Sequence, residues 1–356
     1  MKKLNLALIG QGRSGKNIHG KHLLSERNPY FEVKYVVDAD AFRRERAEGL
    51  YAGCQTFADY RELFNRKDID LVVNATYSED HYPITKALLE HGFNVLVEKP
   101  FARSRYECEE LMQIAEQKQV VLAVFQQTFL APFYLFTREL MRSGKLGEIK
   151  QISIRYNNFA RRWDWQTLQK KCAGGVYNTG PHPIGIGLGL LDFDPDAKLV
   201  YSKLDTALTS GDSDDYAKLL IAASGKPLVD IEINSTDAYS DYNIKLQGSL
   251  GTYKATPKGY EMTYIQPGEN PERPVIETFL KDDAGEPIYC SEKLIKHTES
   301  GTFDGDAFNV GTASLYEQLY FKITEGKPMT VTPQMAAEII SVVEQCHAAN
   351  PLPLKY

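Results

Sequence analysis

The sequence predicts an α/β protein of two domains, in which a doubly wound parallel sheet precedes an α+β domain with an open, mostly antiparallel sheet. Three observations lead to this prediction. The chain has 356 residues, two to three times the usual size of one domain. Its composition, 43% hydrophobic and 25% charged, is that of a globular protein and excludes disordered, collagen-like and coiled-coil chains. The rhythm of strands and helices also changes after residue 125.

Short β-rich runs alternate with helical segments over residues 1–125. The runs are nearly continuous in apolar residues, which is typical of buried parallel strands. They are Leu4–Ile9, Val33–Val37, Leu71–Asn74, Asn94–Val97 and Val120–Phe125. Helical spacing of polar and apolar residues appears between them, at Lys16–Glu26, Ala41–Ala52, Tyr60–Asn65, Tyr82–His91 and Ser104–Lys118. This alternation predicts a parallel sheet with right-handed crossover connections.

Residues 126–356 are predicted to form a second domain, which binds substrate and joins copies of the chain. A helix at Pro132–Ser143 is followed by segments in which polar and apolar residues alternate, the pattern of a half-exposed antiparallel sheet. These segments are Ile149–Phe159, Lys198–Thr206, Asp215–Ala223, Leu228–Asp237, Tyr242–Gln247 and Gly259–Ile265. A Gly- and Pro-rich stretch, Ala173–Leu191, interrupts the sheet. Helices near Val310–Glu325 and Pro333–Ala348 close the chain, and the last helix can pack back on the first domain.

An open sheet leaves one face uncovered, and a symmetric copy of the same chain is the simplest cover for it. We therefore expect a homodimer or a homotetramer joined through the sheet of the second domain.

The charge and hydropathy of the chain argue against nucleic acids and membranes as partners. Its 41 Lys and Arg against 47 Asp and Glu give a net charge of −6, so a basic nucleic-acid surface is not expected. No apolar run reaches the length of a membrane span. The start of the chain imitates a signal peptide, but its short apolar part meets Gln11 and Arg13 without a cleavage site. Five scattered cysteines favour a reducing cytoplasm and predict neither a disulfide frame nor a metal site.

A glycine motif, G-x-G-x-x-G, lies between the first strand and the first helix. It consists of Gly10, Gln11, Gly12, Arg13, Ser14 and Gly15. Gly10 permits a tight turn, Gly12 lets the backbone approach a pyrophosphate, and Gly15 allows contact between helix and strand. The helix N-terminus then offers free N–H groups to the phosphates. The motif predicts a dinucleotide-binding Rossmann domain at residues 1–125.

Asp38 ends the second predicted strand, 23 residues after Gly15. A carboxylate at that place accepts hydrogen bonds from the ribose 2′-hydroxyl and repels a 2′-phosphate, so NAD is the expected cofactor. Arg43 and Arg44 lie close by in the sequence, and they leave NADP open.

Glu98-Lys99-Pro100 follows the apolar strand Asn94–Val97. The carboxyl ends of strands in a doubly wound sheet face the ligand crevice, so this charged pair is expected beside the cofactor. Proline restricts the backbone of Lys99 to extended conformations. An ammonium group there can hydrogen-bond a substrate hydroxyl and stabilise the alkoxide that develops as hydride leaves. A surface pair of Lys and Glu is the alternative interpretation.

A second motif favours the catalytic interpretation: the segment Gly174 to His182, which reads GGVYNTGPH. With this segment, the chain resembles the Gfo/Idh/MocA oxidoreductases, a family that includes glucose–fructose oxidoreductase and inositol dehydrogenases. The resemblance covers almost the whole chain. Besides the segment, it is carried by the glycine motif, by Thr76 to His81, by Glu98-Lys99-Pro100 and by Gly144 to Ile149.

The resemblance implies that Lys99 hydrogen-bonds the reacting hydroxyl and that His182 is the general acid/base. The family also has an aspartate four residues before this histidine, on the same helical face, and here that position is Asn178. Asn offers a neutral hydrogen bond in place of a charge, so we expect His182 to be a weaker base. Either the proton passes mainly through Lys99 or another carboxylate assists, and Asp164 is the candidate.

Further residues are candidates for the substrate pocket. The segment Gln126-Gln127-Thr128 lies where relatives often carry Asn with an Arg pair, so the pocket is expected to differ from that of characterised members. The segment Arg161 to Gln166 holds both tryptophans of the chain and matches a family region near the nicotinamide and the substrate; an aromatic pair in the core or at an interface is the alternative. Tyr156 and Asn157 end the first strand of the second domain.

We therefore predict an NAD-dependent, cytoplasmic dehydrogenase that moves hydride between nicotinamide and a secondary alcohol of a sugar, sugar derivative or cyclic polyol. A non-enzymatic sugar- or NAD-sensing regulator and an NAD-dependent glycosidase are the alternatives. The expected catalytic residues are Lys99, His182 and Asn178; the cofactor-binding residues are Gly10, Gln11, Gly12, Arg13, Ser14, Gly15, Asp38, Thr76, His81, Glu98 and Lys99; the substrate residues are Gln127, Tyr156, Asn157, Arg162, Trp165 and His182. No metal ligand set is expected, and His19 and His22 are expected to be solvated helix residues.

Overall fold

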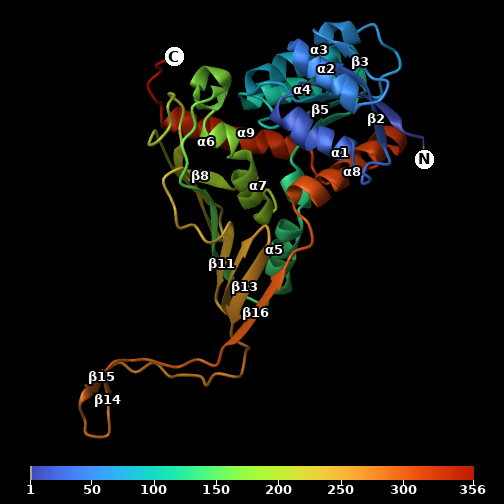
Figure 1. The fold of residues 1–356 in the computed structure, drawn as a ribbon. Coiled ribbons are helices and arrows are strands. Elements are labelled where there is room, and N and C mark those ends of the chain that lie inside the picture. Colours follow the sequence, from blue (N-terminus) through green and yellow to red (C-terminus); the bar gives the residue numbers. More distant parts are fainter. Residues whose placement is uncertain (1) are drawn as a thin grey trace.

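The computed structural model of the chain describes residues 2–356 and contains two large sheets (Figure 1). The first sheet has six parallel strands in the order β3-β2-β1-β4-β5-β6. They are β1 (Leu4–Ile9), β2 (Phe31–Val37), β3 (Gln55–Phe57), β4 (Leu71–Asn74), β5 (Val95–Val97) and β6 (Leu122–Val124), with helices α1 (Lys21–Leu23), α2 (Ala41–Leu50), α3 (His81–Glu90) and α4 (Arg105–Lys118) between them. This strand order is that of a doubly wound sheet, so the predicted class of the first domain is confirmed.

Alternate residues of the buried strands build two cores, one on each face of the first sheet. Leu6 and Leu8 of β1 belong to one apolar cluster, whereas Ala7 and Ile9 belong to the other. Every residue of β4 is buried, because helices cover both faces of a parallel sheet of this kind. This is why the strands form continuous apolar runs in the sequence.

The second sheet has eight strands in the order β16-β13-β12-β11-β7-β10-β9-β8. All neighbours pair antiparallel except β7 and β10, which pair parallel. The strands are β7 (Ile149–Asn157), β8 (Lys198–Asp205), β9 (Tyr216–Ala222), β10 (Leu228–Asn234), β11 (Ile244–Gly248), β12 (Gly251–Thr256), β13 (Gly259–Tyr264) and β16 (His297–Thr302). The predicted α+β class with an open, mostly antiparallel sheet is confirmed.

Helices cover one face of the second sheet (Figure 1). They are α5 (Pro132–Ser143), α7 (Pro181–Leu190) and α9 (Pro333–Ala349). Ile154 of β7 and Ile231 of β10 are fully buried beneath them. The Gly- and Pro-rich stretch is itself helical, forming α6 (Gly175–Asn178) and α7. Its glycines allow close packing, since a Cβ atom added at Gly187 would lie 2.8 Å from a methyl carbon of Val229.

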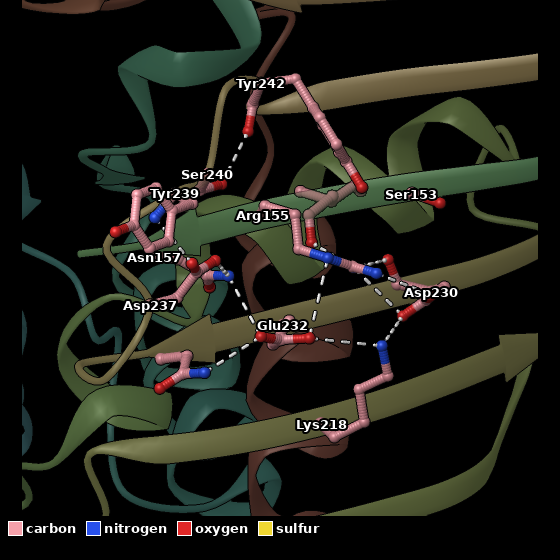
Figure 2. A network of polar contacts seen from close by, with 12 residues as sticks. Ser153, Arg155, Asn157, Lys218, Asp230, Glu232, Asp237, Tyr239, Ser240 and Tyr242 are labelled. Carbon is pink, nitrogen blue, oxygen red and sulfur yellow. Dashed lines mark hydrogen bonds and ion pairs between the residues drawn. The ribbon is translucent and has the colours of Figure 1, made fainter. Parts of the chain in front are cut away.

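The other face of the second sheet carries a network of charges that Figure 2 shows. Arg155 donates to Asp230 at 2.8 Å, Lys218 lies 2.5 Å from Asp230, and Lys218 lies 3.5 Å from Glu232. The Asn157 amide donates to Glu232 at 3.1 Å and thereby joins the network. This face is therefore open but polar, because alternate residues of β7 and β10 point away from the helices.

The two C-terminal helices contact both parts of the chain. Tyr316 of α8 (Thr312–Glu325) packs against Phe31 of β2, with ring centroids 5.6 Å apart. Ala336 and Ile340 of α9 belong to one core of the first sheet. The two C-terminal helices therefore pack on the first domain. The domain boundary at residue 125 stays a prediction.

Some elements were not predicted. These are β3, β12, β16 and a small hairpin of β14 (Leu280–Lys281) and β15 (Pro287–Ile288). Each is short or rich in Thr and Gly, so its apolar periodicity is weak. Among residues 2–356, none of the helices combines the length and the hydropathy that a membrane span requires, and no three His, Cys, Asp or Glu side chains are grouped as metal ligands.

The expectation of solvated histidines on the first helix is wrong. His19 and His22 are both buried, and the His22 ring packs at a tilt against the Tyr316 ring, with 4.7 Å between centroids. The cause is α8, which covers this helix from the other end of the chain and which the local sequence does not reveal. Burial, helped by the charge of His19, lowers the pKa of His22 to about 4.

This lowered pKa makes stability depend on pH. The unfolded chain binds a proton at His22 below about pH 6.5, whereas the folded chain does so only near pH 4. Stability therefore falls as the pH falls from 6.5 toward 4, and His22 contributes about 2 kcal/mol of the loss between pH 7 and pH 5. We expect the His22→Asn variant to lose about 2 kcal/mol less than the wild type over this range in urea unfolding. The exposed His91→Asn variant is the control, and equal slopes for all three proteins would contradict the prediction.

Candidate active site

A cleft of ≈ 550 Å³ lies at the carboxyl ends of the first sheet's strands. Residues following β1, β2, β4 and β5 line one side, as expected for a doubly wound sheet. The opposite side comes from the segment between β7 and α7, and there Trp165 meets Tyr77 edge to face at 5.0 Å between ring centroids. The cleft therefore lies where the first domain meets the second.

The glycine motif forms the tight turn at the floor of this cleft. Gly10 has a φ of +90°, and a Cβ atom there would lie 2.4 Å from the Ala75 carbonyl oxygen. A Cβ atom on Gly15 would lie 1.8 Å from the Gly10 carbonyl oxygen. At Gly12, in contrast, an added Cβ atom meets nothing within 4 Å, so this residue leaves space on the cleft side for a ligand to approach the backbone.

Asp38 lines the cleft at the end of β2, with its side chain nearly buried. Its carboxylate accepts from the backbone N–H of Gln11 at 2.7 Å and from that of Asp40 at 2.9 Å. Arg43 lies 3.6 Å from the same carboxylate, and Arg44 donates instead to the Asp38 carbonyl oxygen at 2.7 Å. These contacts fix a negative charge at this end of the cleft.

Lys99 crosses from the first domain to the second. Its ammonium donates to the carbonyl oxygen of Asn178 at 2.8 Å. Burial lowers the pKa of Lys99, and the positive charges of Arg13 and Arg162 lower it further, while Glu98 opposes them. The group is therefore easier to deprotonate than an exposed lysine.

Glu98 is held in a buried chain of hydrogen bonds. It lies 3.2 Å from His19 Nε2, and His19 Nδ1 lies 2.8 Å from the Tyr316 hydroxyl. Its other carboxylate oxygen accepts from the backbone N–H of Lys99 at 3.0 Å. Although burial opposes it, the His19 hydrogen bond and the charges of His19 and Lys99 lower the pKa of Glu98 to about 2. Glu98 thus stays ionised and fixes the backbone from which Lys99 extends.

His81 offers an acceptor to the cleft. Its Nδ1 lies 2.7 Å from the Pro100 carbonyl oxygen, which can only accept, so Nδ1 carries the proton. Burial lowers the pKa of His81, so Nε2 is unprotonated. Among residues 2–356, this buried Nε2 has no hydrogen-bond partner. An acceptor left unpartnered beside the glycine turn fits the donor groups of a bound dinucleotide.

His182 lies in the first turn of α7. Its Nδ1 is 2.8 Å from the hydroxyl of Thr128, and its ring stacks on Tyr156 at 6.5 Å between centroids. Burial and the charge of Lys99 lower the pKa of His182 to about 3. The imidazole is therefore neutral at pH 7 and able to accept a hydrogen bond.

The side chain of Asn178 turns away from His182, although the two were expected on one helical face. Its Oδ1 accepts from Gln166 Nε2 at 3.0 Å. The reason is a break between α6, which ends at Asn178, and α7, which begins at Pro181. Asp164, the carboxylate expected to assist, pairs with Arg162 at 2.7 Å instead.

The structure brings most of the predicted site residues to the cleft. Those that line it are Gly10, Gly12, Arg13, Ser14, Asp38, Thr76, His81, Glu98, Lys99, Arg162, Trp165 and Asn178. Tyr156 lines an adjoining pocket of ≈ 120 Å³ together with Arg162 and Asn178. Gln11, Gly15, Gln127, Asn157 and His182 line neither space. Gln11 and Gln127 are buried, Asn157 belongs to the charge network on the open face of the second sheet, and the His182 ring lies against Thr128 and Tyr156, of which Tyr156 lines the adjoining pocket.

The sequence did not predict the contacts that three residues make with the site residues: Thr128 with His182, His19 with Glu98, and Tyr316 with His19. Thr128 belongs to a segment expected to differ in the substrate pocket, but its contact with His182 was not foreseen, because it depends on the packing of the short helical turn Gln127–Leu130 on α7. Tyr316 is 297 residues from His19, so no local pattern could join them. The one available signal was the position of His19 four residues after the glycine motif, on the helix that follows it.

Two family models match the chain. One, described as "Oxidoreductase family, NAD-binding Rossmann fold", matches residues 4–126. The other, described as "GFO/IDH/MocA C-terminal domain", matches residues 134–254. Together they cover more than half of the sequence.

Two named proteins are similar to the chain in sequence. The chain is 30% identical to the uncharacterized oxidoreductase YhhX of Escherichia coli (strain K12) over 156 residues, which are 44% of this chain and 45% of that protein. It is 23% identical to the scyllo-inositol 2-dehydrogenase (NADP(+)) IolW of Bacillus subtilis (strain 168) over 357 residues, 96% of this chain and 92% of that protein. The match thus spans less than half of the first relative and nearly all of the second.

A solved structure shares the fold over the whole chain. GenD2 from gentamicin A biosynthesis, crystallised in complex with NAD, aligns with a TM-score of 0.74 and 20% identity, covering 98% of this chain and 94% of that chain. At this identity the likeness concerns the fold alone.

The glycine turn predicts different effects for two matched substitutions. Gly15→Ala places a methyl group against the Gly10 backbone and should lower the free energy of unfolding by about 1–3 kcal/mol. Gly12→Ala places it in open space and should change that free energy by less than about 0.5 kcal/mol. Urea unfolding followed by circular dichroism measures both. A larger loss of stability in Gly12→Ala than in Gly15→Ala would contradict the roles given to these two glycines.

Proposed function

The chain belongs to the Gfo/Idh/MocA oxidoreductase family, and from this premise we propose that it is an NAD-dependent dehydrogenase. Its substrate would be a secondary alcohol of a sugar, sugar derivative or cyclic polyol. The observation that carries the proposal is that Lys99 lines the cleft that the glycine turn opens and bonds to the end of α6, close enough to His182 for its charge to act on the imidazole. A relative that aligns over nearly the full length is named a scyllo-inositol 2-dehydrogenase, which supports a cyclic polyol.

The cleft fits a nicotinamide dinucleotide, which when bound supplies the hydride acceptor for alcohol oxidation. Gly12 and its neighbours would hold the pyrophosphate, and Asp38 would receive the ribose hydroxyls. His81 Nε2 would accept a hydrogen bond from the ligand, since it has no partner of its own among residues 2–356. These residues bind and orient the ligand, and the chemistry of the alcohol falls to Lys99 of the first domain and His182 of the second.

Lys99 would take the hydroxyl proton, and His182 would orient the hydroxyl. Because Asn178 places no charge beside the imidazole, and because the pKa of His182 is only about 3, we assign the imidazole the acceptance of a hydrogen bond that orients the hydroxyl. The lowered pKa of Lys99 makes its neutral amine the better proton acceptor. In the reverse direction, the ammonium would return the proton to the alkoxide.

We further propose that the protein works in the cytoplasm as a homo-oligomer joined through the second sheet. The free cysteines suit a reducing compartment, and the open face of the sheet offers a large polar surface to a second copy.

Substitution at the two groups tests the catalytic assignment. A panel of inositols and sugars, followed by NADH absorbance, should first identify a substrate. Lys99→Met and His182→Asn should then each lower kcat by about 10²–10⁴-fold, with the dissociation constant for NAD nearly unchanged. The rate should rise with pH through an ionisation that persists in His182→Asn and disappears in Lys99→Met.

The exposed Lys203→Met variant is the control for loss of a lysine. Wild-type turnover in both site variants would contradict the assignment. Dinucleotide binding without turnover of any alcohol, or glycoside cleavage without net NADH, would overturn the dehydrogenase proposal itself.

The preference for NAD predicts the effect of a change at Asp38. Asp38→Ser removes the charge that would repel a 2′-phosphate and weakens the hydrogen bonds to the ribose. We expect the ratio of kcat/KM for NAD over NADP to fall at least tenfold, since a hydrogen bond to a charged group contributes about 1.5–3 kcal/mol. Asp40→Ser is the control, because serine keeps the helix cap that Asp40 forms for α2. A wild type that prefers NADP would contradict the proposal.

A further inference from the structure

Residues 271–296 form an arm that projects from the second sheet between β13 and β16 (Figure 1). Two extended legs lead out to the hairpin of β14 and β15 and back. Every side chain of the arm is exposed except that of Leu280, which is half-buried. Among residues 2–356, none of the arm belongs to either apolar core.

The arm is built as a ribbon and not as a flexible linker. Its legs are joined at the base, where the Asn270 side chain bonds both backbone groups of Ile295, and in the middle, where Arg273 donates to Glu292 at 2.9 Å. At the tip, Leu280 pairs with Ile288. The arm contains prolines but only one glycine, whereas flexible linkers are rich in Gly and Ser.

The side chains along this ribbon are unsuited to permanent exposure to water. Val275 is 92% exposed, Phe279 60% and Tyr289 98%. Ile276, Ile288, Leu294 and Ile295 are exposed as well. A two-stranded hairpin alone is marginally stable in water, and an apolar patch of this extent on a soluble chain marks an interaction surface.

We propose that the arm docks on a second copy of this chain, against the outer face of that copy's second sheet. The arm is long enough to form such an interface, because a standard protein–protein interface uses about 20–30 residues on each side and the arm has 26 residues. A two-fold axis would use two arms reciprocally. The arm also turns toward the side of the sheet opposite α5 (Figure 1), where no helix would stand between it and a neighbouring copy.

The outer face offers a place to receive the arm. Two grooves of ≈ 270 and ≈ 430 Å³ hollow it over β11, β12, β13 and β16. Lys245 and Lys254 line the first groove, and Lys254 and Lys258 line the second. Asp241 and Glu261 line both grooves as well, and Lys254 pairs with each of them. The apolar stems of the lysines can cover apolar side chains of the arm while the charged groups stay at the rim.

Mass measurement in solution tests this proposal. In sedimentation velocity over a concentration series, the full chain should form dimers or larger symmetric assemblies. The triple variant Val275→Asp, Phe279→Asp, Tyr289→Asp should raise the dissociation constant at least about 10²-fold, the effect of losing one or two aromatic anchors. These residues are exposed in one copy, so circular dichroism should show an unchanged fold.

A control variant carries three substitutions of exposed apolar residues on the first domain. Leu24→Asp, Phe42→Asp, Tyr106→Asp changes side chains that are 52%, 69% and 73% exposed, and this variant should associate as the wild type does. A monomeric wild type, or an arm variant that associates as tightly as the wild type, would overturn the proposal.

Cys290 gives a second, local readout. It is the exposed cysteine of the five, and it lies on the arm next to Tyr289. A nitroxide label at Cys290 should be immobile in the assembled protein and become mobile on dilution below the dissociation constant. A label that stays mobile at every concentration, or one that stays immobile in a monomer, would show that the arm does not dock on a second copy.

Discussion

The contact on which the site depends is the hydrogen bond from the Lys99 ammonium to the Asn178 carbonyl oxygen, at 2.8 Å. It joins the end of β5 to the end of α6, two elements of different domains. Because α7 follows at once, the same contact brings His182 within the influence of the Lys99 charge. Movement of one domain away from the other would separate the two groups and open the cleft.

Holding a charged lysine at a buried domain junction costs free energy unless its surroundings compensate. Glu98 supplies the compensating charge from the preceding residue. His19 helps to keep it ionised, and the other ring nitrogen of His19 lies 2.8 Å from the Tyr316 hydroxyl. Tyr316 comes from α8, far along the chain, so this helix, which covers the first domain, also supports the end of β5 that carries Lys99. Fold stability and site geometry therefore share one buried network.

Patterns within a single element were predictable, and contacts between distant elements were not. β1 and α5 have the predicted bounds, because apolar runs and helical spacing are local properties. The burial of His19, the partnership of Thr128 with His182, and the break between α6 and α7 depend on packing. Tyr156 and Asn157 show the limit within one strand: both end β7, but alternation sends one toward His182 and the other to the open face.

The most direct test of this account is a crystal structure of the protein with NAD and an unreactive cyclic polyol. We expect one polyol hydroxyl to lie within hydrogen-bond distance of both Lys99 Nζ and the His182 ring, on the side of the cleft facing Trp165. A polyol bound elsewhere, or one whose hydroxyls contact neither group, would contradict the claim that these two residues act on one alcohol.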